Sequence, residues 1–245
     1  MTFRVTQKSI LITGGTSGIG HELVRQLHSD NTLLVIGRNA EKLRDLKAEF
    51  PGVHTYVADL ADPQSLRPVA ETIRSQHPQI DLLINNAAIQ YTALFTGSDF
   101  RYESIAEEIA INFTSPCCLI SLFLPALLKD TPSAILNINS GLGLVAKKSS
   151  AIYCGTKGGL NIFSGALRHQ LANTNIKVFQ AFMPLVDTPM TMGRGHGKMT
   201  ANKAANLIIT GVEKGRLDHD IGMVRILRFL CRLWPAAARN IMKRD

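Results

Sequence analysis

Cysteine is scarce in this sequence. Its 245 residues contain only four, and no two of them form a Cys-x-x-Cys pair. They are Cys117, Cys118, Cys154 and Cys231. This spacing excludes a disulfide framework and predicts reduced thiols. The seven histidines never fall at the spacing of metal ligands, so we expect no metal site.

Long apolar runs and clustered charge are also absent. No apolar stretch reaches the roughly 18–20 residues of a membrane span, and the first residues, MTFRVTQKS, lack the pattern of a signal peptide. The net charge of +8 fits an anionic ligand or an anionic membrane. Because no basic run is interleaved with aromatic residues, we expect no nucleic-acid partner. The sequence thus predicts a cytoplasmic protein.

Short apolar runs alternate with stretches of helical period along the whole chain. The strand-like runs are 10–13, 32–37, 54–58, 81–85, 134–139 and 177–182, and the helix-like stretches are 21–29, 40–50, 63–77, 100–128 and 150–173. Repeated strand, helix and strand predict a parallel sheet with helices on both faces. We therefore expect one α/β domain over residues 1–245, with a doubly wound, Rossmann-like sheet.

A glycine-rich turn, TGGTSGIG at 13–20, joins the first expected strand to the first expected helix. Ligands of a doubly wound sheet bind beyond the carboxyl ends of its strands. Backbone amides at a helix N-terminus, with no Cβ in the way, form an anion site that suits a pyrophosphate. The spacing Gly14-x3-Gly18-x-Gly20 differs from the usual GxGxxG fingerprint, and a tight structural turn is the alternative explanation.

Six motifs in series resemble the short-chain dehydrogenase/reductase family. They are TGxxxGIG, Asp59-Leu60, Asn85-Asn86-Ala87-Ala88, Asn112, Ser140 and Tyr153-x3-Lys157. The resemblance runs from Ser9 to Thr188, and Ala88 departs from it, because the family usually has glycine there. It implies an oxidoreductase that interconverts a small-molecule carbonyl and an alcohol by hydride transfer. It also implies a homodimer or homotetramer, paired through the helix after residue 115 and the helix that carries Tyr153.

Tyr153 and Lys157 are four residues apart and therefore share one face of an expected helix. A free phenol titrates near pH ~10, and lowering its pKa by about 2–3 units takes roughly 3–4 kcal/mol. An ammonium about 4 Å away, in an effective dielectric of ~20, supplies about that much. We expect Lys157 to lower the pKa of Tyr153, the general acid/base that the resemblance implies. An isolated surface pair is the alternative.

Ser140 and Asn112 complete the catalytic tetrad that the resemblance implies. Ser140 ends a strand-like run, where its hydroxyl can hydrogen-bond a developing oxyanion or, alternatively, cap the next loop. Asn112 lies in an apolar helix, where an amide without partners is costly. The resemblance has Asn112 kink this helix and hold a water that relays protons to Lys157. A satisfied core asparagine is the alternative.

Arg38 follows the second expected strand, at a place where a fold selective for NAD usually has an acid. A guanidinium can bind the 2′-phosphate of NADP with two hydrogen bonds. We therefore expect NADP(H) in preference to NAD(H), with the hydroxyls of Thr16 and Ser17 as further donors. A solvated Arg38 paired with Glu41 is the alternative.

Two further segments match family positions that contact the cofactor. Asp59 and Leu60 would frame the adenine, although Asp59 could instead cap the helix after Pro63. Residues of the turn at 183–188 would meet the nicotinamide and a phosphate, although Leu185 stands where glycine is common. The full expected cofactor set is Gly14, Thr16, Ser17, Gly18, Ile19, Gly20, Arg38, Asp59, Leu60, Asn86, Ala87, Tyr153, Lys157, Pro184, Val186 and Thr188.

The C-terminal tail, 221–245, is basic and amphipathic. Arg225, Arg228 and Arg232 share one helical face, apolar side chains lie largely opposite, and Pro235 must break or kink the helix. The tail could pack its apolar face on the domain, with its arginine face in solvent, and so complete a substrate cleft that a short glycine-containing lid leaves open. It could instead lie on an anionic membrane or contact a partner or another subunit. The turn PLVDTPMT and this tail resemble a less characterised branch of the family, associated with the D-alanyl-lipoteichoic-acid operon.

Two other functions remain open on the same fold. One is a cofactor-binding regulator that senses redox state, and the other is a membrane-surface protein whose tail carries the function. Turnover of a carbonyl would separate the enzyme from the regulator.

Overall fold

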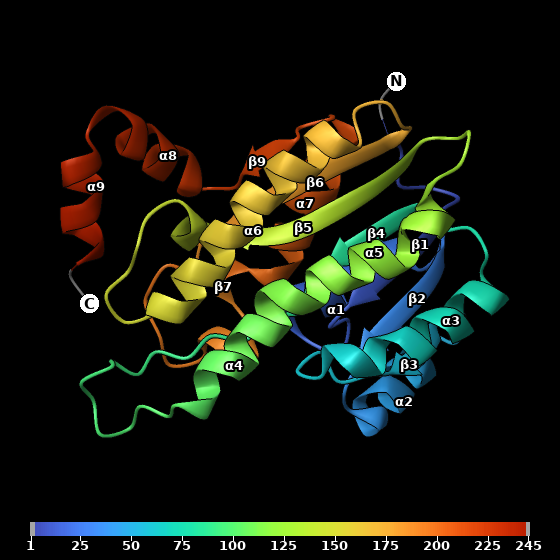
Figure 1. The fold of residues 1–245 in the computed structure, drawn as a ribbon, viewed down its shortest axis with the longest axis horizontal. Coiled ribbons are helices and arrows are strands. Elements are labelled where there is room, and N and C mark those ends of the chain that lie inside the picture. Colours follow the sequence, from blue (N-terminus) through green and yellow to red (C-terminus); the bar gives the residue numbers. More distant parts are fainter. Residues whose placement is uncertain (1–2, 244–245) are drawn as a thin grey trace.

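Seven parallel strands form one sheet with helices on both faces (Figure 1). The structure, a computed structural model, describes residues 3–243. The strands are β1 (Ser9–Thr13), β2 (Thr32–Gly37), β3 (His54–Val57), β4 (Leu82–Asn85), β5 (Ser133–Ser140), β6 (Ile176–Met183) and β9 (Asp218–Asp220), in the order β3-β2-β1-β4-β5-β6-β9. Residues 1–2 and 244–245, the ends of the expected domain 1–245 and of its tail 221–245, lie outside the described residues.

Alternation along the buried strands builds a hydrophobic core on each face of the sheet. Ile10 and Ile12 belong to one core, and Leu11 belongs to the other. The helices of the first core are α1 (Gly18–Leu27), α2 (Ala40–Glu49) and α7 (Ala201–Glu213), and those of the second are α3 (Leu66–Gln76), α5 (Ser115–Leu127) and α6 (Ala151–Gln170). Strand order reverses between β1 and β4, where a doubly wound sheet binds its ligand. This arrangement confirms the expected Rossmann-like fold.

The sequence does not indicate the edge strand β9. Its residues are Asp-His-Asp, which carry no apolar alternation, and only His219 is buried. Pairing with β6 and a hydrogen bond from Gln180 to the Asp218 carboxylate, at 3.0 Å, hold it in the sheet. A polar segment of three residues becomes a strand here because a neighbouring strand supplies its partners.

The expected helix 100–128 is a continuous helical stretch with one irregular turn. It consists of α4 (Glu103–Ile109), a π-helical turn η2 (Ala110–Thr114) and α5. From Glu103 to Leu127 its length and hydropathy are those of a membrane-spanning helix, which was not expected from the sequence. Buried residues such as Phe123 and Leu127 nevertheless belong to the core of the domain.

The C-terminal tail folds back onto the domain beyond the carboxyl ends of the strands (Figure 1). Helix α8 (Val224–Leu233) packs on the turn η3 (Gly141–Gly143), and α9 (Pro235–Met242) follows after a break at Trp234. A Cβ on Gly141 would lie 3.2 Å from both Leu227 and Val224. The break agrees with the expected effect of Pro235. The tail therefore forms one wall of the region where the strands end.

Candidate functional site

A cavity of about 1220 Å³ lies at the carboxyl ends of the central strands. All the expected cofactor-binding residues line it, from the glycine turn through Arg38, Asp59 and Asn86 to the turn after β6. Ser140, Tyr153 and Lys157 line the same cavity, whereas Asn112 does not. Within residues 3–243 no group of three or more His, Cys, Asp or Glu side chains could hold a metal ion.

The glycine turn is packed too tightly for other residues. Gly14 and Gly18 have φ angles of +68° and +54°, in the left-handed region. A Cβ on Gly20 would lie 2.1 Å from the carbonyl oxygen of Gly14. The amide of Asn86 donates to the carbonyls of Thr13, at 2.9 Å, and Gly14, at 3.1 Å. The first helix thus begins at the cavity wall, and Gly18 and Gly20 in its first turn carry no Cβ over their amides. This arrangement fits a pyrophosphate group.

The turn after β6 lies over this helix N-terminus. A Cβ on Gly18 would approach the methyl group of Thr188 to 3.0 Å. The turn is held by β7 (Val186–Asp187) pairing with β8 (Met199–Thr200), and Leu185 lies against Gly195 of the short lid. The pairing of these two-residue strands therefore defines the backbone path of the turn, which could not be predicted from the sequence because Leu185 stands where the family usually has glycine.

Tyr153 and Lys157 are buried on one face of α6, as their spacing predicts. The ammonium of Lys157 donates to the carbonyl of Ile138 at 2.8 Å and lies 5.7 Å from the centroid of the Tyr153 ring. Ser140 serves in two ways, because its hydroxyl accepts from the amide of Leu142 at 3.1 Å and also hydrogen-bonds Tyr153. The capping role and the contact with Tyr153 therefore coexist.

The expected lowering of the Tyr153 pKa by Lys157 is wrong for the protein as it stands. Burial raises the pKa of Tyr153 to about 12, and the hydrogen bond with Ser140 only partly opposes it. Burial also lowers the pKa of Lys157 to about 8, and the carboxylate of Glu108 partly opposes that change. Both effects have one cause, since a low-dielectric surrounding disfavours the charged form of each group. Tyr153 is consequently a neutral phenol at pH 7.

Asn112 lies behind the cavity in the π-helical turn. Its side chain accepts from the amide of Ile89 at 2.9 Å and donates to the carbonyl of Ile89 at 2.8 Å and to Thr156 at 3.4 Å. The irregular turn agrees with a distorted helix at this residue. The side chain itself is a satisfied core amide that ties the loop after β4 to α6.

Arg38 lies exposed at the mouth of the cavity. Over the described residues 3–243, its guanidinium forms no hydrogen bond or ion pair, so the pairing with Glu41 is not observed. Lys42, one helical turn further on, lines the cavity as well. The sequence-based set omits Lys42, although its place in the first turn of α2, just after Arg38, could have revealed it.

Asp59 does not cap the following helix. Its carboxylate accepts from the amide of Ala61 at 2.9 Å, whereas Asp62 accepts from Gln64 at 3.1 Å and caps the short 3₁₀ turn at 63–65. The capping alternative for Asp59 is therefore wrong, and Asp59 remains a lining residue.

The other end of the cavity is apolar and is built mainly by the tail. Its lining from this segment is Met223, Val224, Ile226, Leu227, Leu230, Ile241 and Met242. Gln90, which also lines the cavity, accepts from Arg194 at 3.0 Å and donates to Ser150 at 2.9 Å, which fixes the lid to the residue before α6. The sequence predicted a tail that completes the cleft as one of three alternatives, but it did not identify these residues.

Comparisons with known proteins agree with the motifs. The family model described as short chain dehydrogenase matches residues 8–198. A Bacillus subtilis (strain 168) protein, the uncharacterized oxidoreductase DltE, is 31% identical over 222 residues, which cover 88% of both chains. This similarity confirms the resemblance to the branch that is associated with the D-alanyl-lipoteichoic-acid operon.

Solved structures show the same fold. A Burkholderia cenocepacia short chain dehydrogenase in complex with NADP superposes with a TM-score of 0.87 at 22% identity, covering 98% of this chain and 99% of that one. A Burkholderia phymatum short chain dehydrogenase/reductase in complex with NAD superposes with a TM-score of 0.82 at 19% identity, covering 95% and 96%. The family model, the relative and the shared fold all agree with the glycine turn and the cavity described above. The chain belongs to the short-chain dehydrogenase/reductase family of nicotinamide-dependent oxidoreductases.

Proposed function

We propose that this protein interconverts a carbonyl and an alcohol with NADP(H) as its cofactor, and that Tyr153 is the general acid/base. The observation that carries the proposal is the meeting of Ser140, Tyr153 and Lys157 in the cavity that also contains the glycine cradle. The cofactor, when bound, supplies or accepts the hydride. The protein orients the substrate, polarises its oxygen and handles the proton.

Tyr153 is suited to donate a proton in the reductive direction. Its phenol is neutral, with a pKa raised to about 12 by burial, and it hydrogen-bonds the hydroxyl of Ser140. Both groups can therefore donate hydrogen bonds to one substrate oxygen as negative charge develops on it. Lys157 stabilises the phenolate that forms, and Asn112 is a positioning residue that holds the loop at Ile89 against α6. A water that relays protons to Lys157 is part of the proposal.

The cofactor residues fit a dinucleotide from end to end. The glycine turn would hold the pyrophosphate, Asp59 and Leu60 the adenine, and the turn from Pro184 to Thr188 the nicotinamide. Ile19, Asn86 and Ala87 shape the wall between them. Arg38 and Lys42, with Thr16 and Ser17, would bind the 2′-phosphate that distinguishes NADP(H) from NAD(H).

Arg38→Ala is expected to weaken NADPH binding about tenfold or more and to leave NADH binding almost unchanged. A charge-assisted hydrogen-bonded pair typically contributes about 1.5–3 kcal/mol, and NADH has no phosphate at this position. The measurement is a fluorescence titration of both cofactors against both proteins. Arg44→Ala, which removes an equally charged and exposed residue of α2 outside the cavity, should change neither affinity. An equal loss of affinity for NADPH and NADH in Arg38→Ala, or a preference of the wild type for NADH, would contradict the role of Arg38 in binding the 2′-phosphate.

Oxidation of NADPH in the presence of a carbonyl panel tests the function directly. The apolar tail residues at the far end of the cavity favour bulky apolar carbonyl compounds, so the panel should extend from short to long-chain ketones and aldehydes. Turnover is the expected result. Tight NADPH binding without turnover of any compound would favour the cofactor-sensing regulator instead.

Glu108 provides a pH-dependent test of the same site. It is a buried carboxyl group one turn before Asn112, its carboxylate accepts from the amide of Tyr91 at 3.3 Å, and burial raises its pKa to about 7. Its negative charge raises the pKa of Lys157, so without it Lys157 loses its proton at lower pH. The alkaline limb of the pH profile of kcat/KM is therefore expected to move to lower pH in Glu108→Gln. Glu107 is a neighbouring carboxylate that accepts from the Tyr91 hydroxyl, and in the control Glu107→Gln the alkaline limb should stay in place. An unmoved alkaline limb in Glu108→Gln would contradict the electrostatic coupling of Glu108 to Lys157.

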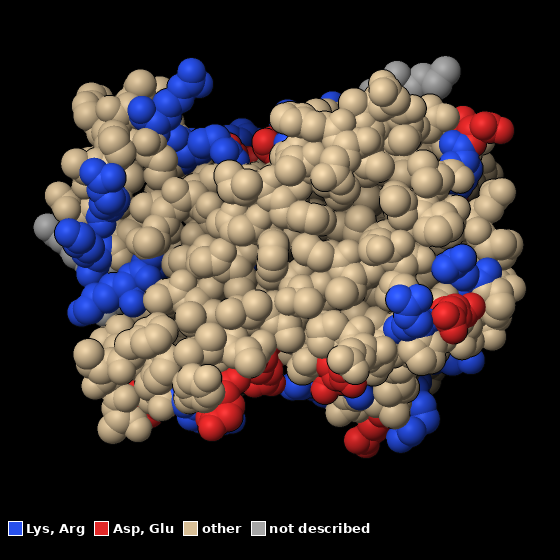
Figure 2. All heavy atoms as spheres, viewed as in Figure 1, with Lys and Arg blue, Asp and Glu red and all other residues tan. Residues whose placement is uncertain are grey.

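We also propose a cytoplasmic homodimer or homotetramer that pairs through α5 and α6. The face over these helices carries few Lys, Arg, Asp or Glu side chains (Figure 2). Ile162 of α6 is 74% exposed, which fits a surface that a second subunit covers. Sedimentation velocity at micromolar concentration measures the assembly, and a monomer alone would contradict it.

A further inference from the structure

The C-terminal helices expose an apolar surface that the domain does not cover. In α8, Ile226, Phe229 and Leu233 are 53%, 57% and 51% exposed, and Trp234 at the break before α9 is 62% exposed. Successive residues of a helix are rotated by about 100°, so Phe229, Leu233, Ile226 and Leu230 form one stripe. A contiguous apolar surface of this kind marks an interaction site.

The inner face of α8 is a second apolar surface, and the two are continuous. Val224 and Leu227 pack on Gly141, and Leu230 lies between them and the exposed stripe on the helical wheel. Ile226, Leu230 and Ile241 line the cavity although Ile226 and Ile241 are more than half exposed. The outer stripe therefore leads without a polar break into the apolar end of the cavity.

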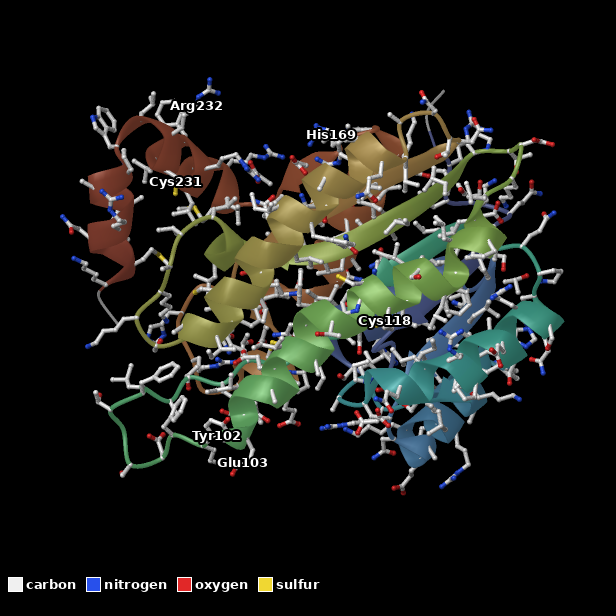
Figure 3. The ribbon with its side chains drawn as sticks, viewed as in Figure 1. Tyr102, Glu103, Cys118, His169, Cys231 and Arg232 are labelled. Atoms are coloured by element: carbon white, nitrogen blue, oxygen red, sulfur yellow. The ribbon has the colours of Figure 1, made fainter. Side chains whose placement is uncertain are left out.

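Basic side chains border this stripe on one edge. Arg228 is used inside the domain, because it forms a bidentate pair with Asp220 at 2.6 and 2.8 Å and stacks on Phe182. Arg232 and Arg239 form no ion pair within residues 3–243, and Arg232 points away from the body of the protein, whereas Cys231 points toward it (Figure 3). No acidic residue occurs in the sequence between Asp220 and Asp245. Lys and Arg side chains accordingly gather over the α8–α9 end of the molecule (Figure 2).

We propose that α8 and α9 dock on an anionic lipid bilayer, with the mouth of the substrate cavity at the lipid surface. Exposed Phe, Leu and Trp beside Arg and Lys are the composition of helices that lie in the interface of anionic membranes. A tryptophan is suited to the headgroup level, where one side of its ring is apolar and the other is wet. A second copy of the chain fits this surface poorly, because pairing the two tails would bring their unpaired arginines together.

The docked orientation identifies the substrate class as an amphipathic, long-chain carbonyl compound that partitions into the bilayer. Such a molecule could pass along the apolar stripe into the cavity without entering water. This step rests on the proposed oxidoreductase function, whereas the docking does not.

The test uses the full chain and vesicles of phosphatidylcholine with or without about one third phosphatidylglycerol. Trp234 is the only tryptophan in the sequence, so its emission reports the tail alone. We expect a blue shift, and quenching by brominated lipid, with the anionic vesicles and not with pure phosphatidylcholine. Co-sedimentation with the anionic vesicles should fall about tenfold or more in Arg232→Gln/Arg239→Gln, in Phe229→Glu/Trp234→Glu and at 0.5 M salt.

The control variant is Arg44→Gln/Lys47→Gln, which removes the same charge from exposed positions of α2 and should bind as the wild type does. Absence of the blue shift, or equal losses in the tail and control variants, would overturn the docking. A change of assembly state in Phe229→Glu/Trp234→Glu without vesicle binding would overturn it in favour of a subunit contact.

A second arm separates docking from function. Tail variants should lose turnover of a long-chain ketone embedded in vesicles and keep turnover of a short soluble one. Vesicle binding without turnover of any carbonyl would leave the docking in place and refute the proposed function. Equal turnover of the embedded ketone by wild-type and tail variants would refute delivery through the tail.

Discussion

Tyr153→Phe is expected to lower kcat for carbonyl reduction at least about 100-fold and to leave the Kd for NADPH nearly unchanged. General acid catalysis contributes about 10²–10⁴-fold, and the substitution removes only the hydroxyl. The ring is buried on α6, so phenylalanine fills the same space and the fold is kept. Steady-state kinetics and a cofactor titration on the same preparation measure the two quantities.

The matched control is Tyr102→Phe. Tyr102 is 80% exposed before α4 and lies outside the cavity, so its variant should keep the wild-type rate. If Tyr153→Phe retains more than about a tenth of the wild-type rate, this residue is not the general acid. A large loss of NADPH affinity would instead assign Tyr153 a mainly structural role in the cofactor site.

Gly20→Ala should be the most damaging single-methyl change in the glycine turn. The new Cβ would lie 2.1 Å from the carbonyl oxygen of Gly14 and 2.5 Å from the amide nitrogen of Asn86, so backbone must move. Overpacking of this kind costs about 1–3 kcal/mol, or roughly 2–12 °C in Tm for a chain of this size. Because the shift displaces the N-terminus of α1, NADPH affinity should fall about tenfold or more. Thermal unfolding with and without NADPH measures both effects.

Gly165→Ala is the control for the methyl group itself. Gly165 lies inside α6, and a Cβ there would meet nothing within 4 Å. Its replacement should raise the free energy of unfolding by about 0.5–1 kcal/mol, because alanine loses less backbone entropy in a helix. If Gly20→Ala changes Tm and NADPH affinity no more than Gly165→Ala does, the glycine turn is not packed as tightly as described.

The arrangement of the site could be predicted from the order of motifs along the chain. The glycine turn, Asp59, Asn86 and Ser140 each follow a strand-like run, and parallel strands place their carboxyl ends at one edge of a sheet. The spacing of Tyr153 and Lys157 placed both on one face of α6. These features depend on residues that are close in sequence or on a rule of parallel sheets, so the sequence alone determines them.

The predictions from the sequence were wrong for side chains whose environment is formed by segments distant in the chain. Tyr153 and Lys157 do share a face, but burial beneath several elements controls both pKa values and raises that of Tyr153. The pattern around Asp59 allowed a cap, yet Asp62 is the residue that caps. In each case the same residues were compatible with two local arrangements, and tertiary packing determined which of the two forms.

The sequence alone was sufficient to establish the doubly wound sheet and the edge at which its ligand binds. The evidence was the period of the apolar residues, the glycine turn and the spacing of the catalytic residues. Each of these patterns is formed by residues that are near neighbours in the chain. The strand β9, the position of the tail and the lining of the substrate end required the folded molecule. Polar β9 is a strand only because β6 pairs with it. Val224 and Leu227 form a cavity wall only because they meet Gly141, a residue of a distant loop. An amphipathic pattern shows that a helix has an apolar face, and only tertiary packing determines how much of that face the domain covers.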